Sequence, residues 1–345
     1  MLYFSENSIR GNHAGTKARN DVENILCNYG CKSINSKKYI LTSDAAESIY
    51  SNITTRLELL KYFLELLAVR NKIVFVQYPM LAFDKEAEYL SKIAQHNHLV
   101  LLVHDVHGLK RQNQNEIDRE ISVLNLANAV IVHNRFMEEK LKECGLSVSK
   151  IYRLNIFDYL CEERITSDHA NESGIAFAGN LEKSEFFSAF CKANPNIPLH
   201  LYGQKFDDRL KAFQNIQYSG SFKPDEIPGK LFGKYGLVWD GDSINTCSGI
   251  FGEYTRYNNP HKLSLYLVAG MPVIVWKYAA IAEFVVNNGV GIAVNSLESL
   301  EKAINCVSEK DYAAMLKNVM ALKAQLLAGN NLKNILRQVE VDFGK

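Results

Sequence analysis

The feature that most constrains the fold is an alternation of short apolar runs with segments that carry apolar residues at helical spacing. In the first half, apolar runs at 72–77, 99–103 and 129–132 alternate with helical patterns at 85–95, 115–126 and 135–144. Apolar strands separated by amphipathic helices are typical of a parallel sheet that is covered on both faces. We therefore predict an α/β fold built on parallel sheets.

The alternation is interrupted by the polar, aperiodic run 161–173 and restarts at 174–178. Further strands are expected at 198–202, 216–218, 237–239, 273–276 and 291–294, and helices at 297–307 and 311–327. At 345 residues the chain is too long for one typical domain. We predict two doubly wound, Rossmann-like domains, 1–165 and 174–330, that face a central cleft, with segment 331–345 packing back on the first domain.

The chain begins with a short apolar run at 2–4, followed by a polar, glycine-bearing loop and a helical pattern that ends near residue 28. A further helical pattern runs from 45 to 69. The loop lacks both G-x-G-x-x-G and G-x-x-x-x-G-K-[ST], which disfavours dinucleotide and P-loop sites. Ligands of doubly wound sheets bind at the carboxyl ends of the strands, so we expect this loop to face the cleft.

Composition excludes several classes of protein. The net charge is +1, which predicts no broad nucleic-acid surface. The seven cysteines are odd in number and form no C-x-x-C pair, which favours reduced thiols over disulfides or zinc. No signal peptide and no run of about 18 apolar residues is evident, so we expect a cytoplasmic protein. Peripheral contact with the inner face of the cell membrane and homo-oligomer formation are left open.

The stretch 258–276 predicts an anion site. Asn259 is expected to cap a helix that starts at Pro260 and stops at Gly270, before an apolar strand. The amino end of a helix carries unpaired N–H groups and partial positive charge, and Lys262 adds a full charge in the first turn. We interpret this as a phosphate site; an ordinary capped helix is the alternative.

Lys183 lies at a second strand-to-helix junction, 179–183, and would supply another cation for one diphosphate without a metal ion. The alternative for each lysine is a solvated surface charge. Phe222 follows a predicted strand, where its ring would stack on a nucleobase or pack in the core.

Asp240 follows the predicted strand 237–239 and, with Glu253 in a predicted loop, is suited to bind sugar hydroxyls. Asp240 and Asp242 also form a D-x-D pair, which suggests a metal site. That motif belongs to a different, single-domain fold, and further oxygen ligands are not evident nearby, so we expect no metal.

The segment 103–107 lies at the carboxyl end of a predicted strand in the first half. A carboxylate or imidazole there would take a proton from an attacking hydroxyl. Asp105 is the first candidate for this catalytic base and His107 is the second. The alternatives are a helix-capping aspartate and a packed or surface histidine.

The complete pattern resembles the two-domain GT-B glycosyltransferases, and more closely the bacterial β-1,6-galactofuranosyltransferases of O-antigen synthesis. The residues that carry the resemblance are GLVWDGDS at 236–243, TCSG at 246–249, NNPHK at 258–262 and SLYL at 264–267, with support from AGNL at 178–181 and GSF at 220–222. The streptococcal glucosyltransferases that extend sugars on serine-rich adhesins are similar to a lesser degree.

The resemblance implies a UDP-sugar donor, with Lys262 and Lys183 at the phosphates and Phe222 at the uracil. The full donor-binding set that it suggests is Gly15, Thr16, Lys183, Phe222, Asp240, Glu253, Asn259, His261 and Lys262. Two positions depart from the pattern of the relatives. Lys183 stands where they tend to have arginine, which loses the bidentate fork. Leu265 stands where the broader superfamily often has a ribose-binding glutamate.

The expected activity is transfer of galactofuranose from UDP-galactofuranose to a sugar hydroxyl of a lipid-linked or oligosaccharide acceptor, in surface polysaccharide or lipopolysaccharide synthesis. UDP-glucose is the alternative donor. A non-catalytic subunit that binds a nucleotide sugar is an alternative from another class; it would tolerate loss of the Asp105 carboxylate.

Overall fold

A computed structural model describes residues 1–5, 14–34, 64–65, 68–80, 86–161, 169, 172–183 and 186–344. The chain divides into two compact units, of which unit 1 comprises residues 1–154 and 331–345 and unit 2 comprises residues 155–330. The helical pattern expected at 45–69 and the polar run at 161–173 lie largely outside the described residues.

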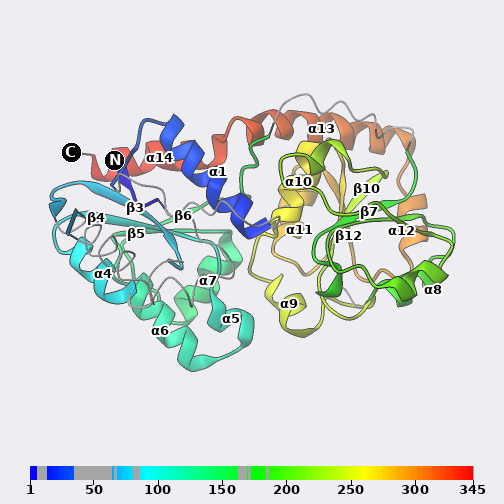
Figure 1. The fold of residues 1–345 in the computed structure, drawn as a ribbon, viewed down its shortest axis with the longest axis horizontal. Helices are drawn as coiled ribbons and strands as arrows, with labels where there is room; N and C mark the ends of the chain where they lie inside the picture. The colour runs from blue at the N-terminus through cyan, green and yellow to red at the C-terminus, as the bar shows by residue number, and fades with distance from the viewer. Residues whose placement is uncertain are drawn as a thin grey trace. The chain divides into compact units, whose positions relative to one another are not determined.

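Unit 1 is built on a parallel six-stranded sheet of order β2-β1-β3-β4-β5-β6. Helices α1 and α14 lie on one face, and α4, α6 and α7 lie on the other (Figure 1). Its elements are β1 (Leu2–Tyr3), α1 (Ala14–Asn28), β2 (Lys32–Ser33), β3 (Ile73–Tyr78), α4 (Glu86–Ala94), β4 (His98–Val103), α5 (His107–Arg111), α6 (Gln114–Leu124), β5 (Ala129–Val132), α7 (Arg135–Glu143), β6 (Lys150–Arg153) and α14 (Asn330–Phe343). Because β3 to β5 are buried on both faces, they read as continuous apolar runs.

The C-terminal helix α14 is part of unit 1. Leu332, Ile335, Leu336 and Val339 form its buried face. At its far end Asp342 accepts a hydrogen bond from the Tyr152 hydroxyl at 2.5 Å and pairs with Lys150 Nζ at 3.1 Å. These contacts attach α14 to the edge strand β6.

Unit 2 repeats the architecture with a parallel sheet of order β12-β11-β10-β7-β8-β9. Helices α10 and α11 lie on one face, and α8 and α12 lie on the other (Figure 1). Its elements are β7 (Ile175–Ala178), η2 (Leu181–Lys183), α8 (Phe187–Ala193), β8 (Leu199–Tyr202), η3 (Asp208–Ala212), β9 (Ile216–Tyr218), η4 (Ile227–Gly229), β10 (Tyr235–Val238), α9 (Gly249–Tyr254), α10 (His261–Ala269), β11 (Val273–Trp276), α11 (Ile281–Asn287), β12 (Gly291–Val294), α12 (Leu300–Asn305) and α13 (Glu309–Leu327).

Helix α10 is the central helix of unit 2. All residues from Leu263 to Ala269 are buried, so this part of the helix is enclosed on every side. It packs on β10, where Gly236 leaves room for the Tyr266 ring; a Cβ at 236 would lie 2.2 Å from that ring. The Tyr266 hydroxyl accepts a hydrogen bond from the Ala178 N–H at 2.8 Å. Strands β7 and β10 are thereby fixed to α10, close to its amino end.

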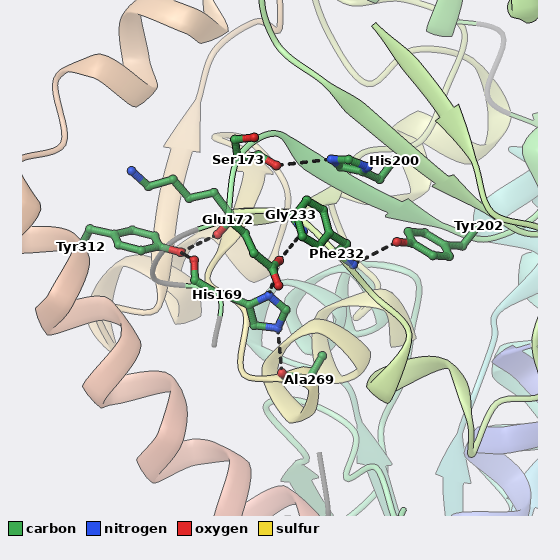
Figure 2. Close-up of polar contacts among 10 residues, drawn as sticks. His169, Glu172, Ser173, His200, Tyr202, Phe232, Gly233, Ala269 and Tyr312 are labelled. Carbon is green, nitrogen blue, oxygen red and sulfur yellow. Dashed lines mark hydrogen bonds and ion pairs between the residues drawn. The ribbon is translucent and has the colours of Figure 1, made fainter. Parts of the chain in front are cut away.

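A polar network fixes the residues just before β7 at the amino ends of the strands of unit 2 (Figure 2). His169 Nδ1 lies 2.7 Å from Glu172 Oε2, and its Nε2 lies 3.1 Å from the Ala269 carbonyl oxygen. Glu172 also accepts a 2.6 Å hydrogen bond from the Gly233 N–H. These hydrogen bonds therefore connect the residues before β7 to Ala269 at the end of α10 and to Gly233, two residues before β10.

Two local predictions were wrong. The segment 248–259 was expected to be a loop, but its residues Gly249–Tyr254 form helix α9. Asn259 was expected to cap α10, but the N-cap residue is Pro260, one position later. The reason is tertiary: the Asn259 amide donates instead to the Asn155 carbonyl at 2.6 Å.

No helix in the described part of the chain is long and apolar enough to cross a membrane.

Candidate functional site

The amino end of α10 lies at the carboxyl ends of β7 and β10, which are neighbours in the sheet. Its N-cap residue, Pro260, has no side-chain donor or acceptor, so it cannot cap the first N–H groups of the helix. Hydrogen bonds from Asn259 to the Asn155 carbonyl and from Ser264 to the Phe157 carbonyl hold this end of the helix in place. The positive end of a buried helix dipole is thus presented at the edge of the sheet.

Lys262 lies in the first turn of this helix. Its Nζ is 2.6 Å from Asp240 Oδ1 and 4.5 Å from the centre of the Phe177 ring. The side chains of Lys262 and Asp240 are 16% and 25% exposed, so the pair is largely enclosed but reachable. The sequence predicted both residues for one site but did not predict that they pair.

The loop after β7 passes closely beneath Lys262. A Cβ at Gly179 would lie 3.1 Å from Lys262 Cε, and a Cβ at Gly203 would lie 1.7 Å from the Gly179 carbonyl oxygen. Gly203 also has a φ of +146°, which a side chain would strain. Hydrogen bonds from the Gly179 and Leu181 N–H groups to the Tyr202 and Gln204 carbonyls complete this contact. Lys183 ends η2, and the structure describes only its backbone.

The other predicted donor-binding residues of unit 2 have protein partners. Phe222 is half-buried, and its ring centre lies 6.4 Å from that of Tyr202. Glu253, on α9, accepts a 2.7 Å hydrogen bond from Arg256 Nε. His261 opens α10 and stacks on Tyr159 at 4.9 Å between ring centres. Ring contacts within the protein thus explain part of the burial of the Phe222 and His261 side chains.

Two predicted donor-binding residues belong to unit 1. Gly15 and Thr16 lie in the first turn of α1, and Thr16 is 8% exposed. The glycine loop that precedes them extends over residues 6–13, which are outside the described part of the chain.

Asp105 follows the carboxyl end of β4 by two residues. Its carboxylate is 38% exposed and lies 3.9 Å from Lys110 Nζ, the separation of a loose ion pair. It does not cap α5: the Glu120 carboxylate of α6 accepts the N–H groups of His107 and Gly108, both at 2.8 Å. His107 is the first residue of α5, and its backbone N–H is one of the two groups that Glu120 caps.

Two residues near Asp105 were missed by the sequence analysis. Glu120 binds the start of α5, and its burial raises the pKa of its carboxyl group. His133 is buried, with Nε2 3.0 Å from the Val103 carbonyl. Burial lowers the pKa of His133 to about 4, although the negative charge of Asp105 opposes that shift. The available signal for His133 was its place directly after the apolar strand β5.

Metal ligands are not gathered in the described residues, where no group of three or more His, Cys, Asp or Glu side chains is placed to hold an ion. Within the D-x-D pair, Asp240 bonds Lys262 and Asp242 bonds the Ser248 hydroxyl. Both carboxylates therefore have protein partners.

The two Rossmann-like units have the GT-B fold, and the relatives in sequence place the protein among the glycosyltransferases. The fold is similar to that of the lipopolysaccharide outer core galactosyltransferase WaaB, with a TM-score of 0.60 over 98% of this chain and 99% of that chain at 11% identity. In sequence the chain is 30% identical to the β-1,6-galactofuranosyltransferase WbbI of Escherichia coli (strain K12), over 99% of each chain. It is 28% identical to glucosyltransferase 3 of Streptococcus parasanguinis, over 70% of this chain and 69% of the relative.

The chain belongs to the glucosyltransferase 3-like family. The N-terminal domain model of that family matches residues 2–156, and the C-terminal domain model matches residues 175–339.

Proposed function

We propose that the protein transfers a galactofuranosyl residue from UDP-galactofuranose to a sugar hydroxyl, through a β-1,6 linkage, during bacterial surface polysaccharide or lipopolysaccharide synthesis. The donor and linkage are supported by the full-length similarity to a β-1,6-galactofuranosyltransferase. The acceptor in this proposal is a lipid-linked glycan or oligosaccharide, reached in the cytoplasm at the inner face of the membrane.

The observation that carries the proposal is the amino end of α10, where a largely enclosed lysine lies beside a helix terminus. Such a site suits the diphosphate of a nucleotide sugar. As the bond between the anomeric carbon and the phosphate oxygen breaks, its electron pair goes to the departing UDP. Lys262 and the helix terminus stabilise that charge, so no metal ion is needed in this proposal.

The acceptor hydroxyl must lose a proton as it attacks the anomeric carbon. In our proposal the Asp105 carboxylate takes that proton, because it is exposed and only loosely paired with Lys110. His107 remains the second candidate for this role.

The test is a calorimetric panel of UDP, GDP, UDP-galactofuranose, UDP-galactopyranose and UDP-glucose, each with and without a chelator. We expect UDP to bind and GDP not to bind, UDP-galactofuranose to bind more tightly than the two pyranose donors, and the chelator to have no effect. Loss of binding with chelator would contradict the metal-free site.

A second candidate donor is UDP-glucose, which the similarity to a streptococcal glucosyltransferase 3 favours. Tighter binding of UDP-glucose in the same panel, with glucose transfer to acceptor, would select this donor. Binding of UDP with neither transfer nor donor hydrolysis would indicate a non-catalytic subunit.

A further inference from the structure

Asp240 is held in place by its own loop. The Trp239 Nε1 that precedes it donates to the Ser243 carbonyl at 2.9 Å. Gly241 has a φ of +119°, and a Cβ there would lie 2.4 Å from the Ser248 carbonyl oxygen. A Cβ at Gly252 would lie 3.0 Å from the Asp240 carbonyl oxygen. The turn after β10 is therefore closed tightly on both sides of this residue.

The lysine is in turn confined by three neighbours. The Phe177 ring faces its ammonium at 4.5 Å, the Gly179 backbone lies against its Cε, and Asp240 accepts one of its hydrogen bonds at 2.6 Å. A lysine side chain in water samples many rotamers, whereas one held at a fixed carboxylate is already ordered before a ligand arrives.

We infer that Asp240 is a positioning residue for Lys262, and that it directs the ammonium to the amino end of α10 without binding the donor sugar itself. This inference rests on the proposed function, because the group that Lys262 would meet there is the diphosphate of the donor. An ammonium has three N–H donors, so Lys262 can keep its bond to Asp240 and still donate to phosphate oxygens.

Three roles for Asp240 predict different effects of Asp240→Asn on affinity for UDP. A carboxylate that only repels the anionic ligand would weaken binding, so its removal would strengthen binding. A carboxylate that binds only sugar hydroxyls would leave UDP affinity unchanged and reduce that of the UDP-sugar. A positioning carboxylate fixes the lysine, so its removal weakens the binding of UDP itself.

The experiment is a double-mutant cycle on UDP affinity, measured by calorimetry with wild type, Asp240→Asn, Lys262→Ala and the double variant. We expect Asp240→Asn to weaken UDP binding about tenfold, which corresponds to about 1.4 kcal/mol. The double variant is expected to bind UDP no more weakly than Lys262→Ala, because the aspartate acts through the lysine. Unchanged or tighter UDP binding by Asp240→Asn, or additive losses in the double variant, would overturn the inference.

The conservative variant Asp240→Glu keeps the charge and is expected to bind UDP more tightly than Asp240→Asn; equal affinities would contradict the positioning role. The matched control is Asp242→Asn, which removes a carboxylate two residues away that bonds Ser248 and not the lysine. Its UDP affinity should equal that of wild type. Thermal unfolding of each variant verifies the fold.

The two levels of the hypothesis fail differently. If Lys262→Ala itself leaves UDP affinity unchanged, the phosphate site of the proposed function is wrong. If Lys262→Ala weakens UDP binding but Asp240→Asn does not, only the positioning role is wrong.

Discussion

The two sheets carry the same residue arrangement at their carboxyl ends, with different geometry. Asp105 follows the last residue of β4 by two positions and meets Lys110 of the next helix at 3.9 Å. Asp240 follows the last residue of β10 by two positions and meets Lys262 of a later helix at 2.6 Å. The first carboxylate is 38% exposed and the second is 25% exposed.

This difference separates two kinds of chemistry. A close, enclosed pair fixes the cation and occupies the carboxylate, which suits a site that must hold an anion in one position. A loose pair leaves the carboxylate able to accept a proton. In the proposed function, Lys262 is the group that acts in unit 2 and Asp105 is the group that acts in unit 1, and the difference between the two pairs supports that proposal.

The largest expected effect is at Lys262. Lys262→Ala should reduce kcat/KM for transfer by about 10³-fold, because the departing UDP loses its fixed cation. Lys277→Ala is the matched control: that exposed lysine follows β11 at the same edge of the sheet, and its loss should leave transfer near the wild-type rate. Near-normal turnover by Lys262→Ala would contradict the phosphate-binding role of this lysine.

Asp105→Asn is expected to reduce kcat by about 10²-fold, the usual scale of a lost general base. UDP affinity should not change, since the proposed diphosphate site is formed by Lys262 and the amino end of α10 in unit 2. Steady-state kinetics and calorimetry on the same variant measure the two quantities. If Asp105→Asn keeps full activity, either His107 is the catalytic base or the contrast between the two ion pairs is wrong. A reduced kcat of His107→Gln would indicate the first, and an unchanged kcat would indicate the second.

The buried imidazole of His133 predicts a pH effect on stability. Its folded pKa of about 4 lies below the ordinary value of 6.5, so the unfolded chain binds the extra proton first. The contribution of neutral His133 to the free energy of unfolding is therefore fully present above pH 6.5 and is lost as the pH falls from 6.5 toward 4. The free energy of unfolding should fall by about 2 kcal/mol between pH 6.5 and 5 from this group. Urea unfolding at several pH values should show a shallower decline in His133→Gln, and equal slopes would contradict the assignment.

The smallest effect is expected at Lys110. Lys110→Ala removes a loosely paired cation, and an exposed pair of this kind contributes little. Transfer should stay within about twofold of wild type. A loss comparable to that of Lys262→Ala would erase the contrast between the two pairs.

Strands of the sheet interiors were predictable because burial on both faces makes them continuous apolar runs. The edge strand β6, with the sequence KIYR, was missed because its exposed positions are polar. Helix α9 was missed because two glycines in GIFGEY disfavour a helix locally. In both cases, the tertiary environment decides the outcome.

The candidate site shows the same division. The places of Asp105 and Asp240 after strand ends, and of Lys262 in the first turn of a helix, could be predicted from the sequence, while their roles stay predictions. Their partners could not be predicted, because Asp240 and Lys262 are 22 residues apart and the Asn259 amide bonds a carbonyl 104 residues away. Glu120 reaches the start of α5 from another helix, and no local motif records that contact.

The close approach of Gly203 to Gly179 has a practical consequence for engineering donor preference. Even a methyl group at 203 would collide with the backbone beneath the lysine, so a library that varies this position would yield mostly misfolded members. Mutagenesis aimed at a new sugar should keep both glycines and vary the side chains around them.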